Sequence, residues 1–405
     1  MISVEEAVDR ICGAFSLLGS ESVPLERALG RVLAHNVLAA CDQPPAAVSA
    51  MDGYAVRLAD AGKAGAALNL IGEAPAGRPF PGRVGPDDAV RIFTGAVMPD
   101  GADAVLIQEN AQRRGRQVVV ETAASSKHVR PAGLDFRRGE ILGRTGRRLG
   151  ARDLALLAAG DAACVEARRK PRVALVSTGD ELSRPGEPRK PGGIVASSLY
   201  GLCPLVAQWG GEPLDLGILP DDVDAIGALP VLAKGADLVV TLGGASVGDH
   251  DLVQRALEPR GFVLDFWKIA MRPGKPLIFG RLGSTPLIGL PGNPVSAFVC
   301  AHLFVKPAIA AMMGMPTAPA LLGARTAGAM PANDSRQDYV RAHFEFRDGD
   351  LWATPFPLQD SSMLSALAAA DGLIVRRPYA EAVAVGDTVA VLSFGDDSRA
   401  PDMGG

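Results

Sequence analysis

Apolar residues follow a helical spacing near the N-terminus, and this spacing is lost further along the chain. A capping box of Ser3 and Glu6 precedes apolar positions that recur every three or four residues, which predicts an amphipathic helix over residues 3–18. A second helix is expected after Pro24, with an apolar face made of Leu25, Ala28, Leu29 and Val32. Residues 46–135 carry short apolar runs broken by Gly, Pro, Asn and Asp, which is typical of a small β-rich domain. Helical spacing returns at residues 151–159, so the β-rich segment is expected to be an insertion in a helical domain.

From residue 171 onward, buried strand patterns alternate with helical patterns. The expected strands are residues 172–177, 212–219, 236–242, 264–270 and 285–290, and the expected helices are residues 199–209, 222–233, 251–257 and 294–312. This alternation implies a parallel sheet covered by helices on both faces. After Pro316 short strand patterns return at residues 339–346, 351–355, 372–376 and 388–392, which fit a small C-terminal β-barrel.

The predicted fold is therefore that of a multidomain α/β and β protein. A helical N-terminal domain of residues 1–45 plus 136–170 carries the inserted β-rich domain of residues 46–135. A central doubly wound parallel-sheet domain follows, and then a small barrel and a short tail, at residues 171–318, 319–396 and 397–405. The tail has no apolar content to bury and is expected to be disordered.

Composition indicates a soluble protein and excludes a general affinity for polyanions. The chain is 48% hydrophobic and 21% charged, and its formal net charge is -4. This net charge gives no general attraction to nucleic acid or to an anionic membrane, so any anion site is local. The low aromatic content of 5% also argues against surfaces that stack on bases. The N-terminus is acidic, unlike a signal peptide, and the five cysteines contain no C-x-x-C pair. We expect reduced thiols, a cytoplasmic location and, at residues 295–315, a core helix.

Four loops of the α/β region concentrate glycine, proline, acids and bases: residues 177–182 (STGDEL), 241–251 (TLGGASVGDHD), 271–276 (MRPGKP) and 289–297 (GLPGNPVSA). At least three of them follow a predicted buried strand. Ligands of such folds bind where the carboxyl ends of parallel strands meet. The loops therefore predict a site for a phosphorylated ligand and a metal.

The loop of residues 289–297 is the simplest of the four to interpret. Asn293 suits the N-cap of a helix and Pro294 suits its first turn, so free N–H groups are expected to point back over Gly292 toward an anion. An ordinary tight turn between a strand and a helix would read the same way. Both readings stay open for this loop alone.

The other loops supply donors, acids and bases, each with a structural alternative. Gly243, Gly244, Gly248 and Ser246 are enough for a nest of backbone donors around a phosphate or a pterin-like ring. Acids beside a polyphosphate are useful when Mg²⁺ bridges them, but they also cap helices; these acids are Asp180, Glu181, Asp249 and Asp251. Basic side chains at the P-G-K-P turn would neutralise an oxyanion or form a solvated patch; they are Lys268, Arg272 and Lys275.

Together with three N-terminal segments, these loops closely resemble the molybdopterin molybdenumtransferase (MoeA) family, which is similar to the E domain of gephyrin. The segments are SAMDGYAVR from Ser49, RIFTGAVMPDGADAV from Arg91 and HVRPAGLDFRRGE from His128. The resemblance covers nearly the whole chain. It implies a molybdopterin-binding type of central domain and an elongated homodimer. It also implies an activity, the insertion of molybdate into adenylylated molybdopterin with release of AMP, helped by Mg²⁺.

The resemblance assigns roles by position. Asp52, Thr94 and Asp135 match groups that in the family face the sheet domain of the other subunit, and Glu181 and Asp251 match acids that resemble metal ligands. These five residues form the implied catalytic set. Loops and resemblance together give these substrate-binding positions: Arg130, Ser177, Thr178, Gly179, Asp180, Asp221, Gly243, Gly244, Ser246, Gly248, Lys268, Arg272, Lys275, Pro291, Gly292, Asn293, Pro294, Arg341 and Ser361. Arg341 with Ser361 resembles an oxyanion contact, whereas Asp52, which precedes Gly53, also fits a plain Asx turn.

The chain departs from the family pattern at three places. Residues 195–198 read Val-Ala-Ser-Ser where an acidic or Asn residue and then Ser/Thr-Asn are usual, so a polar ligand contact is expected to be missing. Arg272 replaces a common lysine, and Leu242 replaces a small hydroxyl residue. An arginine keeps the charge but binds oxyanions with a planar fork.

Two other functions remain open at this point. A molybdopterin adenylyltransferase resembles residues 171–318 and uses similar loops, but lacks the N-terminal segments. A non-catalytic scaffold would keep the fold with reduced chemistry. The expected partners are adenylylated molybdopterin, molybdate, a second copy of the chain and, transiently, other proteins of cofactor assembly or acceptor proteins.

Overall fold

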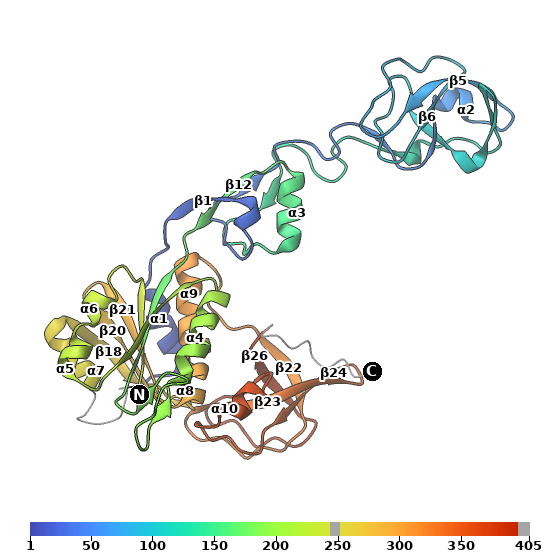
Figure 1. The fold of residues 1–405 in the computed structure, drawn as a ribbon. Helices are drawn as coiled ribbons and strands as arrows, with labels where there is room; N and C mark the ends of the chain where they lie inside the picture. Colours follow the sequence, from blue (N-terminus) through green and yellow to red (C-terminus); the bar gives the residue numbers. More distant parts are fainter. Residues whose placement is uncertain (244–251, 396–405) are drawn as a thin grey trace. The chain divides into compact units, whose positions relative to one another are not determined.

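The computed structural model describes residues 1–243 and 252–395 (Figure 1). The chain forms two compact units, one of Met1–Ser20 with Arg168–Gly405 and one of Glu21–Ala167. The first helix, α1 (Val4–Gly13), belongs to the first unit, where it packs on α9 (Lys306–Met313), and not with residues 136–170 as expected. It is also shorter than predicted, although Ser3 caps it by accepting from the Glu6 N–H at 3.1 Å.

A six-stranded sheet forms the centre of the first unit, in the order β16-β13-β17-β21-β20-β18. The first four strands are parallel, and the last two are antiparallel to their neighbours. Their bounds are β16 (Glu212–Leu219), β13 (Arg172–Thr178), β17 (Leu238–Leu242), β21 (Thr285–Leu290), β20 (Pro276–Leu282) and β18 (Phe262–Lys268). Every residue of β17 is buried, as expected for a strand covered on both faces.

The antiparallel edge of this sheet was not expected from the sequence. Strand β20 follows the P-G-K-P turn directly and was missing from the predicted strands. Only Gly283 and Ser284 separate it from β21, and such a short connection forms a hairpin because a parallel crossover needs a dozen residues or more. Gly283 has a φ of +60°, which suits this turn.

Helices cover both faces of the sheet (Figure 1). One face carries α5 (Val223–Gly227), α6 (Leu229–Leu232) and α7 (Leu252–Leu257), so the single helix expected over residues 222–233 is split in two. The other carries α1, α4 (Ser197–Gln208), α8 (Pro294–Cys300) and α9. Pro294–Met313 is continuous through a π turn and long and apolar enough to span a membrane, but 83% of its most apolar window is buried in the protein, as in a core helix.

The C-terminal part of this unit is a small barrel. Strands run in the order β23-β24-β22-β26-β25, and a further pairing between β23 and β25 closes the ring. Their bounds are β22 (Leu321–Thr326), β23 (Gln337–Arg347), β24 (Asp350–Pro355), β25 (Gly372–Arg376) and β26 (Thr388–Ser393), with α10 (Leu364–Ala368) between β24 and β25. The short strand β19 (Met271–Arg272) adds to β23 in parallel, so the P-G-K-P turn starts in the barrel sheet.

The second unit contains a β-rich part with its own core. Its sheet has the order β7-β4-β6-β5-β9-β8, with β4 (Gly53–Val56), β5 (Ala67–Ala74), β6 (Asp88–Ile92), β7 (Ala104–Ile107), β8 (Ala111–Arg114) and β9 (Gln117–Val120). Buried apolar residues on both faces of this sheet, such as Leu106 and Val90, form two clusters. This arrangement agrees with the predicted β-rich insertion.

The rest of the second unit is less helical than expected. It pairs β1 (Ser20–Pro24) with β12 (Cys164–Arg168) and β2 (Val37–Leu38) with β11 (Ile141–Gly143), beside α3 (Ala151–Ala159). The helix predicted after Pro24 was wrong: only a 3₁₀ turn, Leu25–Arg27, forms there. Leu29 is 63% exposed, and Gly30 follows with a φ of +74°, which ends the turn before a second one can form.

Candidate functional site

A cavity of about 920 Å³ lies at the carboxyl ends of β13, β17 and β21. It brings together nine of the predicted positions, which come from separate segments of the sequence. They are Ser177, Thr178, Glu181, Asp221, Gly243, Pro291, Gly292, Asn293 and Pro294. The convergence of loops expected from the strand pattern is therefore present in the first unit.

Asn293 and Pro294 begin a helix at the wall of this cavity. Asn293 has an extended backbone and takes the N-cap position, but its side chain does not cap the helix. Its Nδ2 instead donates to the Ser361 hydroxyl at 2.9 Å, and the Val295 N–H donates to the Ser361 carbonyl at 3.1 Å. Ser361, expected to contact an oxyanion, thus fixes the loop at the start of Pro294–Met313. The Val295 N–H is thereby occupied and Pro294 has none, so what this helix end offers an anion is mainly the partial positive charge of its N-terminus.

Two glycines are required by close approaches to groups that line this cavity. Gly179 has a φ of +151°, and a Cβ there would lie 2.6 Å from Glu181 Oε2. Gly243 has a φ of +91°, and a Cβ there would lie 2.8 Å from the Thr178 carbonyl oxygen. A side chain at either position would displace a group that lines the cavity, so the glycines keep the loops close together.

The acids of the cavity suit a divalent cation that is shared with a phosphorylated ligand. Glu181 and Asp221 line the cavity. Asp180 lies beside Asp221: the Asp221 N–H donates weakly to the Asp180 carboxylate at 3.4 Å, and the Asp180 N–H to the Asp221 carboxylate at 3.5 Å. Among residues 1–243 and 252–395, no group of three or more His, Cys, Asp or Glu could hold a metal by itself. Mg²⁺ commonly takes one or two carboxylates and completes its shell with phosphate and water, so the residues present fit it.

Part of the predicted set lies outside the described residues. These positions are Gly244, Ser246, Gly248, Asp249 and Asp251. Within the described part of the chain, the buried hydroxyls of Thr178 and Thr241 have no hydrogen-bond partner. Because an unmade hydrogen bond is costly for a buried group, the Thr178 hydroxyl at the cavity wall suits a ligand oxygen.

Several cavity residues were missed by sequence reasoning. Arg255 and Leu252 of α7 and Ser362 of the loop before α10 line the cavity. Arg255 stands one helical turn beyond the glycine-rich loop, a spacing that could have identified it. The segment that departs from the family pattern, residues 195–198, also lines the cavity, and α4 begins there at Ser197.

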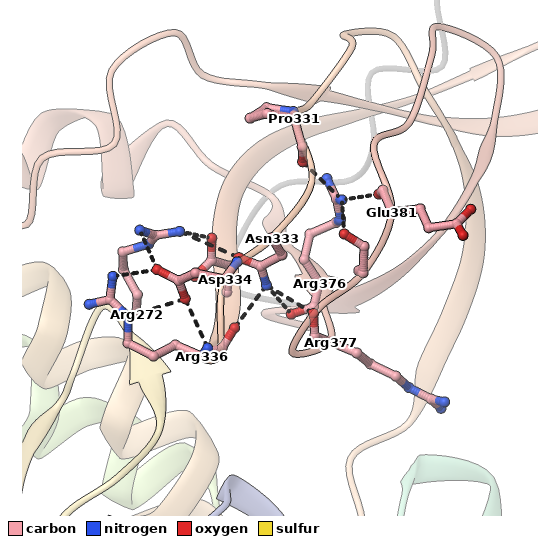
Figure 2. Close-up of polar contacts among 10 residues, drawn as sticks. Arg272, Pro331, Asn333, Asp334, Arg336, Arg376, Arg377 and Glu381 are labelled. Atoms are coloured by element: carbon pink, nitrogen blue, oxygen red, sulfur yellow. Dashed lines mark hydrogen bonds and ion pairs between the residues drawn. The ribbon is translucent and has the colours of Figure 1, made fainter.

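The predicted basic residues do not line this cavity. Lys268 Nζ lies 3.6 Å from the centre of the Trp267 ring, and the Arg272 guanidinium pairs with acids of the barrel (Figure 2). The Lys275 side chain is exposed, next to Pro276 at the cavity wall. The sequence could not show that Arg272 has carboxylate partners more than sixty residues away.

Arg341 is only 1% exposed and supports the loop that carries Ser361. Its guanidinium donates to the carbonyls of Met363 and Leu358 at 3.2 and 3.3 Å and to Gln359 Oε1 at 3.2 Å. Burial lowers the pKa of Arg341 from its usual value. In this arrangement the arginine holds a loop and leaves no surface for a ligand.

The second unit carries the remaining predicted residues. Asp52 Oδ1 accepts from the Thr94 N–H at 2.7 Å and from the Thr94 hydroxyl at 2.8 Å. The backbone donor, then the hydroxyl, and more weakly the charge of Arg91, lower the pKa of Asp52 below its ordinary value. Arg130 is exposed on β10 (Val129–Arg130), which pairs with β3 (Val48–Ser49), and Asp135 is exposed on the loop that follows. A charged, half-exposed carboxylate such as that of Asp52, held by a threonine, is suited to contacting a ligand or another chain.

Known proteins match this chain along nearly its whole length. Three family models match in succession: MoeA N-terminal region (domain I and II) over residues 2–160, a probable molybdopterin binding domain over residues 174–311, and MoeA C-terminal region (domain IV) over residues 323–394. A molybdopterin molybdenumtransferase of Haemophilus influenzae is 34% identical over 381 residues, which are 93% of this chain and 94% of the relative. A relative of the same name from Bacillus subtilis is 33% identical over 408 residues, or 98% and 95%.

A solved structure agrees with these matches. The crystal structure of a molybdopterin biosynthesis MoeA protein from Pyrococcus horikosii superposes with a TM-score of 0.84 at 31% identity, covering 97% of this chain and 99% of that one. The resemblance inferred from the loop motifs is thereby confirmed. The chain belongs to the molybdopterin molybdenumtransferase (MoeA) family.

Proposed function

We propose that this protein is a molybdopterin molybdenumtransferase, which inserts molybdate into adenylylated molybdopterin with Mg²⁺-dependent release of AMP. The observation that carries the proposal is the 920 Å³ cavity, where a helix N-terminus, two close-packed glycine loops and two carboxylates meet. Family membership supports the choice of substrates, because relatives that cover over nine-tenths of the chain carry this name.

The chain's own groups divide the work of binding and cleavage. The partly positive N-terminus of Pro294–Met313 would attract oxyanions of the phosphoanhydride, and the Thr178 hydroxyl would bond to a ligand oxygen. Glu181, together with Asp251, would hold Mg²⁺, which when bound supplies charge that neutralises the phosphoanhydride oxygens. Lys275 would attract molybdate, a tetrahedral dianion, as a compact positive charge.

The second unit would complete the site in a homodimer. Asp52, Thr94 and Asp135 are proposed to face the cavity of the other subunit. The partial exposure of Asp52 and its lowered pKa, which keeps the carboxylate charged at neutral pH, support this role. We also propose a cytoplasmic enzyme that contacts other assembly or acceptor proteins transiently, and that binds neither nucleic acid nor membrane, in keeping with its net charge of -4.

The proposal is tested by incubating the purified protein with adenylylated molybdopterin, molybdate and Mg²⁺ and measuring AMP and transferable cofactor. Glu181→Gln should lower AMP release by about 100-fold or more, because it removes a carboxylate that would hold the Mg²⁺ that neutralises the anhydride. The matched control is Glu212→Gln, at the amino end of β16 and thus at the opposite edge of the sheet, which should keep wild-type rates. An Asp251→Ala variant should behave like Glu181→Gln while remaining folded.

The same assay separates the alternatives. Formation of adenylylated molybdopterin from ATP and molybdopterin, without molybdate-dependent AMP release, would identify an adenylyltransferase. Substrate binding with no turnover would indicate a scaffold. Full activity of Asp251→Ala or Glu181→Gln would contradict the metal assignment.

A further inference from the structure

A cluster of charged residues joins the P-G-K-P turn to the barrel (Figure 2). Strand β19 pairs in parallel with β23, so that Arg272 lies opposite Asp338. The Gln337 N–H donates to the Ala270 carbonyl at 2.8 Å and reinforces this pairing. The start of the turn is therefore a strand of the barrel sheet, while its end leads into β20 of the central sheet.

The guanidinium of Arg272 is bound by carboxylates from the barrel. One nitrogen contacts Asp338 Oδ2, and another lies 3.6 Å from Asp334 Oδ2. The Asp338 side chain is 14% exposed, whereas that of Arg272 is 49% exposed. In the described residues Asp338 Oδ1 is buried without a hydrogen-bond partner, so the pair with Arg272 is what offsets the burial of this charge.

Asp334 is held in place by contacts of its own. Asp334 accepts from the Arg336 side chain at 2.8 Å and from its backbone N–H at 2.8 Å, and these bonds, with the charges of Arg336 and Arg272, lower the pKa of Asp334 to about 2. Asn333 Nδ2 donates to the carbonyls of Arg336 and Arg377 at 2.8 and 2.9 Å, which fixes the loop before β23 (Figure 2). Asp334 is thus charged and held in place by protein groups alone.

The middle of the turn is fixed from the other side by the helix. Gly274 has a φ of +108°, and a Cβ there would overlap Cys300 Sγ of α8. The Cys300 thiol also points to the Gly274 carbonyl at 3.8 Å. With Arg272 bound at one end and Gly274 packed in the middle, Lys275 is the turn's exposed cation, and among the described residues it has no ion pair.

We propose that Asp338 and Asp334 form a carboxylate latch that holds Arg272, so that Arg272 acts as a positioning residue for the turn that carries Lys275. The inference rests on the proposed function. It explains why an arginine suits a position where lysine is common: its planar fork reaches both acids at once, whereas an ammonium is a point charge. An oxyanion would have to displace two ordered carboxylates to use Arg272 itself.

The test combines hydrogen exchange with kinetics. Asp338→Asn should speed amide exchange in a peptide covering residues 269–277 by about tenfold and raise the KM for molybdate by about tenfold with kcat nearly unchanged, since it removes one charge-assisted bond. Lys275→Ala should raise that KM without changing exchange. Arg272→Lys should fall between Asp338→Asn and wild type. The control is Asp350→Asn, which breaks the exposed pair with Arg325 on the same barrel and should change neither readout.

Asp334 gives a second variant if Asp338→Asn does not fold, because its side chain is 46% exposed. Asp334→Asn should change both readouts in the same direction by a smaller factor. Unchanged exchange in the folded Asp338 or Asp334 variants would overturn the latch, and faster exchange with an unchanged KM would overturn its link to the substrate. If the wild-type protein released no AMP, the proposed function would fail while the exchange data still tested the latch.

Discussion

Asp52 and Thr94 form the best-defined pair of predicted site residues in the second unit, and each of its bonds can be tested separately. Thr94→Val removes the hydroxyl donor but keeps the backbone N–H, which is the larger cause of the lowered pKa. The pKa of Asp52 should therefore rise only part of the way to its ordinary value. Carboxyl ¹³C NMR titration of the full-length protein measures this shift. Thr94→Ser, which keeps the hydroxyl, should leave it unchanged; an unaltered pKa in Thr94→Val would contradict the bond.

The pH dependence of this pair has a definite sign. Because the folded-state pKa of Asp52 lies below the unfolded value, the pair stabilises the fold fully above the ordinary carboxyl pKa. That contribution is lost as pH falls through the lowered value. Thr94→Val should therefore make the second unit less sensitive to acid within this window.

The role of a residue could be predicted where it depends on its neighbours in the sequence, and not where it depends on distant partners. Gly179, Gly243 and Asn293 were recognisable because their loops follow strands. Arg272 was assigned to the ligand from its charge and its turn, and Arg341 from the family resemblance, yet the guanidinium groups of both are engaged by barrel residues. A sequence shows which charges exist, whereas burial and pairing decide which of them a ligand can reach.

At the scale of elements, strand β4 depends on the absence of a side chain at Gly53. A Cβ there would lie 2.9 Å from the Ile107 Cα and overlap the neighbouring strand β7. Gly53→Ala should destabilise the second unit by about 3 kcal/mol, since backbone cannot yield as a side chain can. Urea unfolding followed by a probe in that unit measures the change. Gly13→Ala, whose new methyl group meets nothing within 4 Å, is the control and should be nearly neutral.

Strands marked by a continuous apolar run were predictable, and elements set by a glycine or a short connection were not. The parallel strands β13, β17 and β21 stand out because nearly all their residues are apolar and buried. The helix after Pro24 failed because Gly30 ends it within one turn, although four apolar residues have helical spacing. Strand β20 was hidden because the P-G-K-P turn and the Gly283 hairpin lie at its two ends.

At the scale of the whole molecule, a site shared between subunits predicts complementation. Asp52→Ala and Glu181→Ala subunits, each inactive as homodimers, should regain activity when mixed, because one of the two sites then has both carboxylates. The mixed dimer should therefore recover about half of the wild-type rate of AMP release, measured on verified heterodimers. Verified heterodimers without recovery would argue for sites built within one chain.

The Met271–Pro276 segment belongs to two sheets, and this limits how the chain can be divided. Its first residues are a strand of the barrel, and its last residue starts a strand of the central sheet. A protein shortened to residues 171–318 would keep the strand-end loops of the cavity but lose the loop with Ser361 and Ser362, the partner strand of β19 and both acids that bind Arg272. The central domain of this protein is therefore not a self-sufficient module, and its turn acquires a defined shape only when the barrel is present.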